Sequence, residues 1–360
     1  MARECGFHRN AFDVIRLLAA LQVIFGHMYI HYKLNDVSDI FQPLLTVSQY
    51  IPGRGVIIFF AVSGFLAMGS IERARSLKEY VMKKFIRIYP ELIVCFIVNS
   101  IIILVFFGVR GGGTLDYLVY AFTQLTIFQF YTGEWLRGYG VGTPNGALWT
   151  ITVIIQFYGV IFFAKDWMKS TNPKRWELWI LISALISVVI SNSKPYLPII
   201  IYKLLGCSLI PYAYIFLIGL FCYRFFDELI PYMEKNWVWL LCLYVVVRFV
   251  ILKIIGLTGV NLGVNYDVFS ATLLSLISIG IAYRLGEIRF KHELSYGLFL
   301  WHMVVVNIGC ELMKTHQLDS CDMCVLTGLT VAISAMLALG SQICVAIPVR
   351  RFLEQYKSAN

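Results

Sequence analysis

The sequence predicts an all-α, polytopic integral membrane protein, and two observations carry this prediction. Of the 360 residues, 59% are hydrophobic and only 14% are charged, so the chain has more apolar surface than one soluble core can hide. Stretches of about 18 or more residues with almost no charge recur along the chain, and a backbone that crosses lipid must satisfy its own hydrogen bonds. These stretches should be helices, because the polar and apolar alternation of a membrane barrel is missing.

About ten transmembrane helices are expected, together with one short re-entrant or interfacial segment at 117–131. The predicted spans are 12–31, 51–70, 88–108, 146–164, 176–192, 203–223, 236–254, 267–284, 295–312 and 323–348. Two glycine-rich segments, 110–114 and 132–146, should be irregular. No polar stretch is long enough to fold alone, so residues 1–360 are expected to form a single membrane domain.

The net charge of +9 comes from basic residues in the short loops between spans, which favours topology determination over nucleic-acid binding. The loop at 71–89 is rich in lysine and arginine, whereas the loop at 32–52 holds one lysine against two aspartates. The first of these loops should therefore be cytoplasmic, and both termini with it. If 117–131 crossed the membrane, every later basic cluster would be exported, so this segment is not expected to span.

Arg16 and His27 are the leading candidates for a functional site. They lie eleven residues apart in the first predicted span, which puts both side chains on one face of a helix, about 16 Å apart along its axis. Ionisable groups inside a span are costly and mark functional sites by default. Asp13, one turn earlier, can pair with Arg16. In the structural alternative, Arg16 snorkels to the cytoplasmic interface and His27 hydrogen-bonds a neighbouring helix.

The chemistry of these two side chains suggests separate roles. A neutral imidazole can take a proton from a hydroxyl nucleophile, which makes His27 a candidate general base. A guanidinium near the cytoplasmic end can hold phosphate in a bidentate grip, which suits Arg16. No metal is expected: His27 and His31 form an i, i+4 pair without the glutamate of a zinc helix, and Cys321 and Cys324 form an isolated pair.

Five segments, in order along the chain, resemble the membrane-bound acyltransferase 3 family. FDVIRLLAALQVIFGH resembles its opening helix, whose hallmark is an arginine and a histidine with ten residues between them. GVIIFFAVSGFLAMGS resembles its FF-x-x-SGF segment, and KKFIRIYP resembles the basic motif before its third span. ALWTITVIIQFYGV resembles its LWxLxxExQFY segment, and LSYGLFLWH resembles its SYxLYLxH helix.

The resemblance implies acyl transfer from a cytoplasmic acyl-CoA, usually acetyl-CoA, to a hydroxyl of a carbohydrate at or beyond the outer face of a bacterial inner membrane. Arg16, helped by Lys84 and Arg87, would hold the phosphates of CoA, while His27 would deprotonate the sugar hydroxyl. No metal and no acyl-enzyme intermediate are required, and the sequence has no activated serine or cysteine arrangement that would argue for one.

The resembling segments also supply supporting candidates, each with a structural alternative. Lys84 and Arg87 fit the positive-inside rule as well as a donor site, and Tyr89 follows them. Ser63 with Gly64 fits close helix packing. Trp149 fits an interface anchor.

Three more side chains complete the set. His302 is either a second acid or base or a buried hydrogen-bonding residue, and Tyr296 lies in the same segment. Arg54 opens the second span on the predicted outer side, where its side chain can snorkel.

Two departures from the family pattern limit the interpretation. Ile154 stands where many relatives carry a glutamate, so no catalytic acid is placed in that span. Many larger relatives carry an SGNH-type hydrolase domain, and this chain shows none, which favours lipid-linked or surface saccharides such as O-antigen, enterobacterial common antigen or exopolysaccharide units. The expected partners are therefore membrane lipid, such an acceptor and separate glycan-assembly proteins.

Two rival functions remain. Intramembrane arginine and histidine also mark transport pathways, so a transporter or flippase for a lipid-linked or small polar substrate is the main alternative. The inverted repeats and paired broken helices of many transporters are not evident in the sequence. A sensor or scaffold that keeps the fold without the chemistry is a third reading, to which the loss of glutamate at Ile154 gives some weight.

Overall fold

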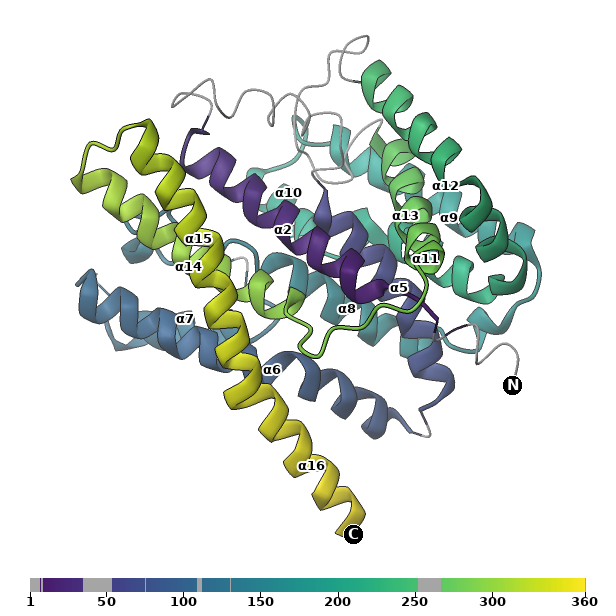
Figure 1. Cartoon of the computed structure of the whole chain (residues 1–360), viewed down its shortest axis with the longest axis horizontal. Coiled ribbons are helices and arrows are strands. Elements are labelled where there is room, and N and C mark those ends of the chain that lie inside the picture. The colour runs from purple at the N-terminus through teal and green to yellow at the C-terminus, as the bar shows by residue number, and fades with distance from the viewer. Residues whose placement is uncertain are drawn as a thin grey trace. The chain divides into compact units, whose positions relative to one another are not determined.

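The computed structural model describes residues 7, 9–34, 54–74, 76–108, 112–129, 131–251 and 267–359. Every regular element in these ranges is a helix, which confirms the all-α prediction for the described part of the chain (Figure 1). Most of the predicted outer loop at 32–52 and the span ends at 51–53 and 252–254 lie outside the described residues. So do positions 75, 110–111 and 130 of the other predicted loops and segments.

The chain forms two compact units, and helices α2 (Phe12–His31) and α8 (Trp149–Phe163) contribute residues to both. The first unit comprises Met1–Ala19, Thr46–Ala74 and Val153–Lys291. Its other helices are α5 (Gly55–Glu72), η3 (Trp167–Lys169), α9 (Pro173–Asn192), α10 (Ile199–Gly206), η4 (Ile210–Tyr212), α11 (Ala213–Arg224), α12 (Phe226–Phe249) and α13 (Val268–Arg284).

The second unit comprises Ala20–Leu45, Arg75–Thr152 and His292–Asn360. Its other helices are α6 (Leu77–Ile101), η1 (Ile102–Phe106), α7 (Thr114–Leu125), η2 (Glu134–Leu136), α14 (Ser295–Thr315), α15 (Ser320–Ser341), η7 (Gln342–Ala346) and α16 (Ile347–Ala359). The prediction of a single membrane domain stays a prediction.

Helix α5 is the core of the first unit, because its side chains are buried on every face. It packs against α11 and α13. Two glycines allow α5 and α11 to approach closely: a Cβ at Gly64 would overlap the carbonyl oxygen of Phe216, and a Cβ at Gly219 would overlap that of Ala61. Small residues permit this kind of backbone contact between membrane helices. The packing role expected of Gly64 is therefore confirmed.

Helix α14 has the same position in the second unit. Its residues from Gly297 to Asn307 are buried without interruption, and it packs against α15 and α6 (Figure 1). Most side chains of this segment are apolar. A helix that is hydrophobic on every side is expected to lie in a core, and α14 does. The polar exceptions within it, His302 and Asn307, are fully buried and belong to the site described below.

Local sequence explains where several helices begin. Ser76 precedes α6, and its hydroxyl accepts a hydrogen bond from the Glu79 amide at 3.2 Å. Asp319 and Asp322 form a capping box at the start of α15, in which each carboxylate accepts from the other residue's amide. These side chains satisfy amide groups that have no partner within the first helical turn.

The predicted number of about ten spans is not confirmed. Among the described residues, six helices are long and apolar enough to cross a membrane, and α10 with η4 and α11 would add a seventh as one span bent by 49°. Two predicted spans correspond to shorter apolar helices, α8 with 15 residues and α13 with 17. Helix α12 has 24 residues but carries charged side chains in both halves.

The described part of the apolar stretch at 117–131 does not form a helix long enough to cross a membrane. Helix α7 covers 12 residues, about 18 Å, whereas the hydrocarbon core of a bilayer is about 30 Å thick. Leu115, Leu118 and Phe122 are exposed along it. This length agrees with the re-entrant or interfacial assignment.

The crossing of α5 and α11 is testable by adding one methyl group. Gly64→Ala should lower the free energy of unfolding by about 1–3 kcal/mol, because the new Cβ overlaps the backbone of Phe216. Gly159→Ala on α8 is the matched control, since a Cβ there meets no atom within 4 Å. Thermal unfolding of the purified protein in detergent measures both, and equal unfolding midpoints would contradict the close packing.

Candidate active site

Arg16 lies in the first unit and forms the ion pair expected with Asp13. Its Nη2 donates to Oδ1 of Asp13 at 2.7 Å, and the other carboxylate oxygen accepts from the amide of Phe290 at 3.3 Å. The Nε of Arg16 is buried and has no hydrogen-bond partner. A guanidinium that is partly neutralised and still has a free donor suits the binding of an anionic group.

His27 lies in the second unit, further along the same unbroken helix α2. Its ring centre is 5.2 Å from that of His302 on α14 and 5.6 Å from that of His31, with which it is stacked at 8°. The structure thus brings together three imidazoles from two sequence segments more than 270 residues apart. In the described part of the chain, no group of three or more histidine, cysteine or acidic side chains could hold a metal ion.

One hydrogen bond fixes the tautomer of His302. Its Nδ1 lies 3.1 Å from the carbonyl oxygen of Leu298, and because a carbonyl can only accept, Nδ1 carries the proton of the neutral ring. The lone pair is therefore on Nε2, which is buried and has no hydrogen-bond partner. Nδ1 of His27 is also buried without a partner. Unpaired buried polar atoms are costly, so two on neighbouring rings indicate a site that handles a proton or a ligand.

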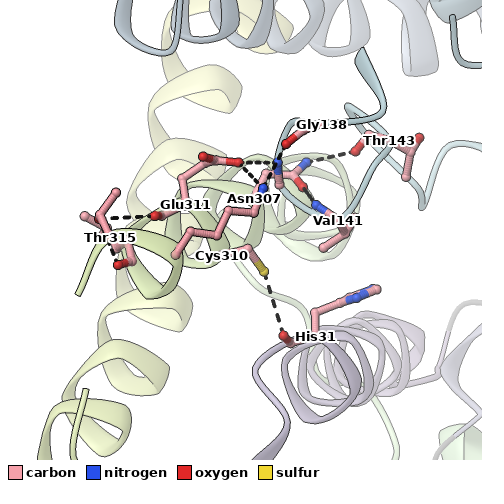
Figure 2. A network of polar contacts seen from close by, with 11 residues as sticks. His31, Gly138, Val141, Thr143, Asn307, Cys310, Glu311 and Thr315 are labelled. Carbon is pink, nitrogen blue, oxygen red and sulfur yellow. Dashed lines mark hydrogen bonds and ion pairs between the residues drawn. The ribbon is translucent and has the colours of Figure 1, made fainter. Parts of the chain in front are cut away.

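The C-terminal end of α2 is held within the second unit next to these histidines. The hydroxyls of Tyr32 and Thr330 of α15 are 2.9 Å apart, and the thiol of Cys310 lies 3.9 Å from the carbonyl oxygen of His31 (Figure 2). A Cβ at Gly309 would overlap the Tyr32 hydroxyl. Burial raises the pKa of Tyr32 to about 12, so this hydroxyl stays neutral. The backbone that carries His27 is therefore held in a fixed position against α14 and α15.

Asn307, on the same helix as His302, holds the glycine-rich loop at 138–144. Its Oδ1 accepts from the amide of Val141 at 2.9 Å, and its Nδ2 donates to the carbonyls of Thr143 at 3.0 Å and Pro144 at 2.9 Å (Figure 2). All the hydrogen-bonding groups of this buried amide face the loop. Asn307 thus replaces the regular secondary structure that the loop lacks.

One turn later on α14, Glu311 and Lys314 hold the start of the same loop. The carboxylate of Glu311 accepts from the amide of Gly140 and from Nζ of Lys314, both at 2.6 Å, and Lys314 donates to the carbonyl of Gly138 at 2.8 Å. Gly140 has φ +53°, and a Cβ there would overlap the Asn307 side chain. Only glycine fits this position without strain.

Two more asparagines, Asn99 on α6 and Asn145 in the loop, link α6 to the loop and the loop to α14. Asn99 donates to the Pro144 carbonyl at 3.2 Å, and Asn145 donates to that of Leu300 at 2.9 Å. Asn99 and Asn145, with Tyr120 and Gln124, supply the polar lining of a cavity of about 10 Å³, room for a single water molecule.

The basic motif before the third predicted span also meets α14. The hydroxyl of Tyr296 donates to the carbonyl of Ile88 at 2.8 Å, and Tyr296 interacts electrostatically with Arg87. Nζ of Lys84 lies 5.3 Å from the ring centre of Tyr80, and Tyr89 stacks on Phe85 with ring centres 4.3 Å apart. Two segments predicted to take part in one site are therefore in contact, at the start of α14 and in the first half of α6.

The remaining predicted candidates have less specific surroundings. Ser63 is half-buried on α5 in the first unit, beside the glycine that packs on α11. Trp149 is half-buried and opens α8. Gln156, which follows the missing glutamate at Ile154, uses both ends of its amide structurally: it donates to the Cys207 carbonyl at 3.2 Å and accepts from the Leu209 amide at 2.9 Å. This side chain bridges the break between α10 and η4.

Sequence reasoning missed Asn307 and Glu311. Their spacing of four residues on one helix face was a signal, since polar side chains in a predicted span need partners. The partners, however, are backbone groups of an irregular loop more than 160 residues away, and no local pattern predicts them.

In the described part of the chain every regular element is a helix, and six helices are long and apolar enough to cross a membrane. Together with two adjacent histidines that have unpaired ring nitrogens, these features fit an integral membrane enzyme. The Acyl_transf_3 family model, described as an acyltransferase domain, matches residues 9–339, and the chain belongs to this family. It is a membrane acyltransferase.

Two known proteins are similar to this chain over most of their length. The chain is 29% identical over 326 residues to nodulation protein 10 of Rhizobium leguminosarum bv. viciae, with 83% of each chain covered. It is 25% identical over 318 residues to an O-acetyl transferase of Shigella phage Sf6, with 83% of this chain and 86% of the relative covered. No solved structure gives a significant match.

The attachment of the loop to α14 can be measured by hydrogen exchange. Asn307→Ala removes the acceptor of the Val141 amide, and Glu311→Gln weakens that of the Gly140 amide, so exchange at 138–144 should be at least about tenfold faster in each variant. Glu134→Gln, an exposed acidic residue near the same loop, is the control and should leave these rates unchanged. Unchanged protection in Asn307→Ala would show that the loop is held by other contacts.

Proposed function

We propose that the chain transfers an acetyl group from cytoplasmic acetyl-CoA to a hydroxyl of a cell-envelope saccharide. The observation that carries this proposal is the pair of adjacent imidazoles, His27 and His302, each with a buried ring nitrogen that has no hydrogen-bond partner, in a chain that belongs to an acyltransferase family. The relative described as an O-acetyl transferase supports acetyl as the group and oxygen as the acceptor atom.

In the proposed reaction, His27 accepts the proton of the acceptor hydroxyl while the hydroxyl oxygen attacks the carbonyl carbon of the thioester. A new ester C–O bond forms, the C–S bond breaks, and the proton leaves on the CoA thiol. The hydrogen bond to the Leu298 carbonyl keeps the proton of His302 on Nδ1. Its Nε2 is therefore a second proton acceptor beside His27. The proton can pass between the two rings before it reaches the leaving group.

The donor is proposed to enter from the cytoplasm. Arg16, with a free Nε, would bind phosphate of the CoA, assisted by Lys84 and Arg87. Asp13 holds the Arg16 side chain in place through their ion pair. The acceptor would be a lipid-linked or surface saccharide such as an O-antigen, enterobacterial common antigen or exopolysaccharide unit. We further propose that the chain lies in a bacterial inner membrane with both termini in the cytoplasm and acts beside separate glycan-assembly proteins.

The general-base role predicts a loss of turnover without a loss of donor binding. His27→Ala should lower kcat for acetyl transfer by about 100-fold or more, because general-base catalysis typically contributes about 10²–10⁴ in rate. The assay follows acetyl-CoA consumption by the purified protein in detergent with undecaprenyl-linked sugars. His316→Ala, an exposed histidine at the end of α14, is the control and should keep wild-type turnover.

Full turnover in a correctly folded His27→Ala variant would refute the proposed base. If the wild-type protein consumed no acetyl-CoA with any of these acceptors but moved them across proteoliposome membranes, the transporter alternative would replace the enzyme.

The donor-binding role predicts the opposite pattern for Arg16. Arg16→Ala should raise the Kd for acetyl-CoA by about tenfold or more, since a charge-assisted contact to phosphate is worth roughly 1.5–3 kcal/mol, while His27→Ala leaves this Kd within about twofold. Isothermal titration calorimetry without acceptor isolates the binding step. Lys174→Ala, an exposed residue near the start of α9, is the control for loss of one basic charge. Equal Kd values for wild type and Arg16→Ala would exclude the phosphate contact.

A further inference from the structure

Buried charged side chains occur in both units, and their partners differ in kind. In the first unit, Arg54 turns inward and pairs with Asp267, which Arg248 also contacts, so the snorkelling expected of Arg54 is wrong. In the second unit, Glu91 on α6 is 4% exposed, and its Oε2 accepts from the hydroxyl of Ser341 at 3.1 Å. An ionisable residue buried in a membrane helix is costly and marks a functional site by default. The proposed reaction does not yet use Glu91.

Ser341 joins Glu91 to the helix that carries His302. Its hydroxyl oxygen accepts from the indole Nε1 of Trp301 on α14 at 3.1 Å. The same hydroxyl lies 3.1 Å from the Ala338 carbonyl of its own helix, but a carboxylate is the stronger acceptor for its proton. Ser341 ends α15 where the π-helical turn η7 begins, and such turns are frequent at functional sites. Glu91, Ser341 and Trp301 therefore form a buried chain of hydrogen bonds from α6 to α14.

The contacts of α6 with α14 centre on one turn, residues 296–301. A Cβ at Gly297 would lie only 3.2 Å from Oε2 of Glu91, so the absent side chain lets the carboxylate approach the backbone of α14. One turn along α6, the thiol of Cys95 donates to the carbonyl of Leu300 at 3.6 Å. Together with the Tyr296 hydroxyl bond to α6 described above, these contacts hold the turn from one face of α6.

This turn contains the group that orients His302. The carbonyl of Leu298 lies within it and accepts from Nδ1 of His302, which keeps the lone pair of the ring on Nε2. A shift or rotation of the turn would therefore move Nε2 relative to His27, whose ring centre is 5.2 Å away. Functional side chains in proteins commonly depend on such supporting hydrogen bonds for their orientation.

We propose that Glu91 is a positioning residue for acetyl transfer: through Ser341 and Trp301 it fixes the turn of α14 that orients His302 beside His27. In this role Glu91 accepts a hydrogen bond and transfers no proton. The inference rests on the proposed function for the part that the histidines play in the reaction, whereas the support of the turn can be measured without acetyl transfer.

Two substitutions of Glu91 test whether its acceptor oxygen matters. Leucine is similar in size but accepts no hydrogen bond, whereas the amide oxygen of glutamine can still accept from Ser341. Glu91→Leu should lower kcat for acetyl transfer by about tenfold or more and leave the Kd for acetyl-CoA within about twofold, since lost supporting hydrogen bonds typically cost about 10–100-fold in activity. Glu91→Gln should keep at least about half of the wild-type kcat. The acetyl-CoA assay and calorimetry described above measure both quantities.

A matched pair of serines on α15 tests the bridge itself. Ser341→Ala removes the link between Glu91 and Trp301 and should lower kcat about threefold or more. Combined with Glu91→Leu it should add little further loss, because both changes break one chain of contacts. Ser334→Ala is the control: this serine is also buried, but its hydroxyl donates to the Thr330 carbonyl within its own helix, so kcat should stay at the wild-type value.

Hydrogen exchange provides a readout that is independent of acetyl transfer. Amides at 297–302 should exchange about tenfold faster or more in Glu91→Leu than in the wild-type protein, and at the wild-type rate in Ser334→Ala. If the wild-type protein transferred no acetyl group, this measurement would still decide whether Glu91 holds the turn, so failure of the proposed function and failure of this inference are separate results.

Three outcomes would overturn the proposal. Wild-type turnover in Glu91→Leu would show that His302 needs no such support. A loss in Glu91→Gln as large as that in Glu91→Leu would show that the charge of the carboxylate matters and not its hydrogen bond. Unchanged exchange at 297–302 in Glu91→Leu would show that other contacts hold the turn.

Discussion

The need to pair every polar atom that lies among apolar helices organises this protein. In the second unit, α14 carries His302, Asn307 and Glu311, and each finds its partner in backbone groups. The same demand explains why an irregular, glycine-rich loop can lie against a buried helix: the amide of Asn307 and the carboxylate of Glu311 take the place of a helix or strand ladder. Where the pairing is incomplete, at Nε2 of His302 and Nδ1 of His27, the molecule has its strongest candidates for chemistry.

The first unit shows how the same rule acts on charge. Asp13 and Arg16 form a pair within one helical turn, which partly neutralises the arginine and leaves one donor free. Arg54, Arg248 and Asp267 form a nonlocal cluster in which both guanidinium groups contact one carboxylate. The first arrangement leaves one guanidinium donor of Arg16 unpaired on the helix that carries His27, and the second joins three helix ends.

Features that depend on residues close in sequence were predictable. The limits of α2, the Asp13–Arg16 pair and the short length of α7 follow from helical periodicity, i, i+3 spacing and hydrophobic length. The approach of His302 to His27 could be expected only through the family motifs, because nothing local connects them. The number of spans is not confirmed, because apolar composition does not reveal where a helix is short or broken.

That break, between α10 and η4, is bridged by the amide of Gln156, which is donor at one end and acceptor at the other. A carboxylate in its place would lose the donor, and a lysine would lose the acceptor, so the position selects for a neutral amide on architectural grounds. In this chain the glutamine of the motif therefore holds a kinked helix together, and that architectural task accounts for its amide without any part in catalysis.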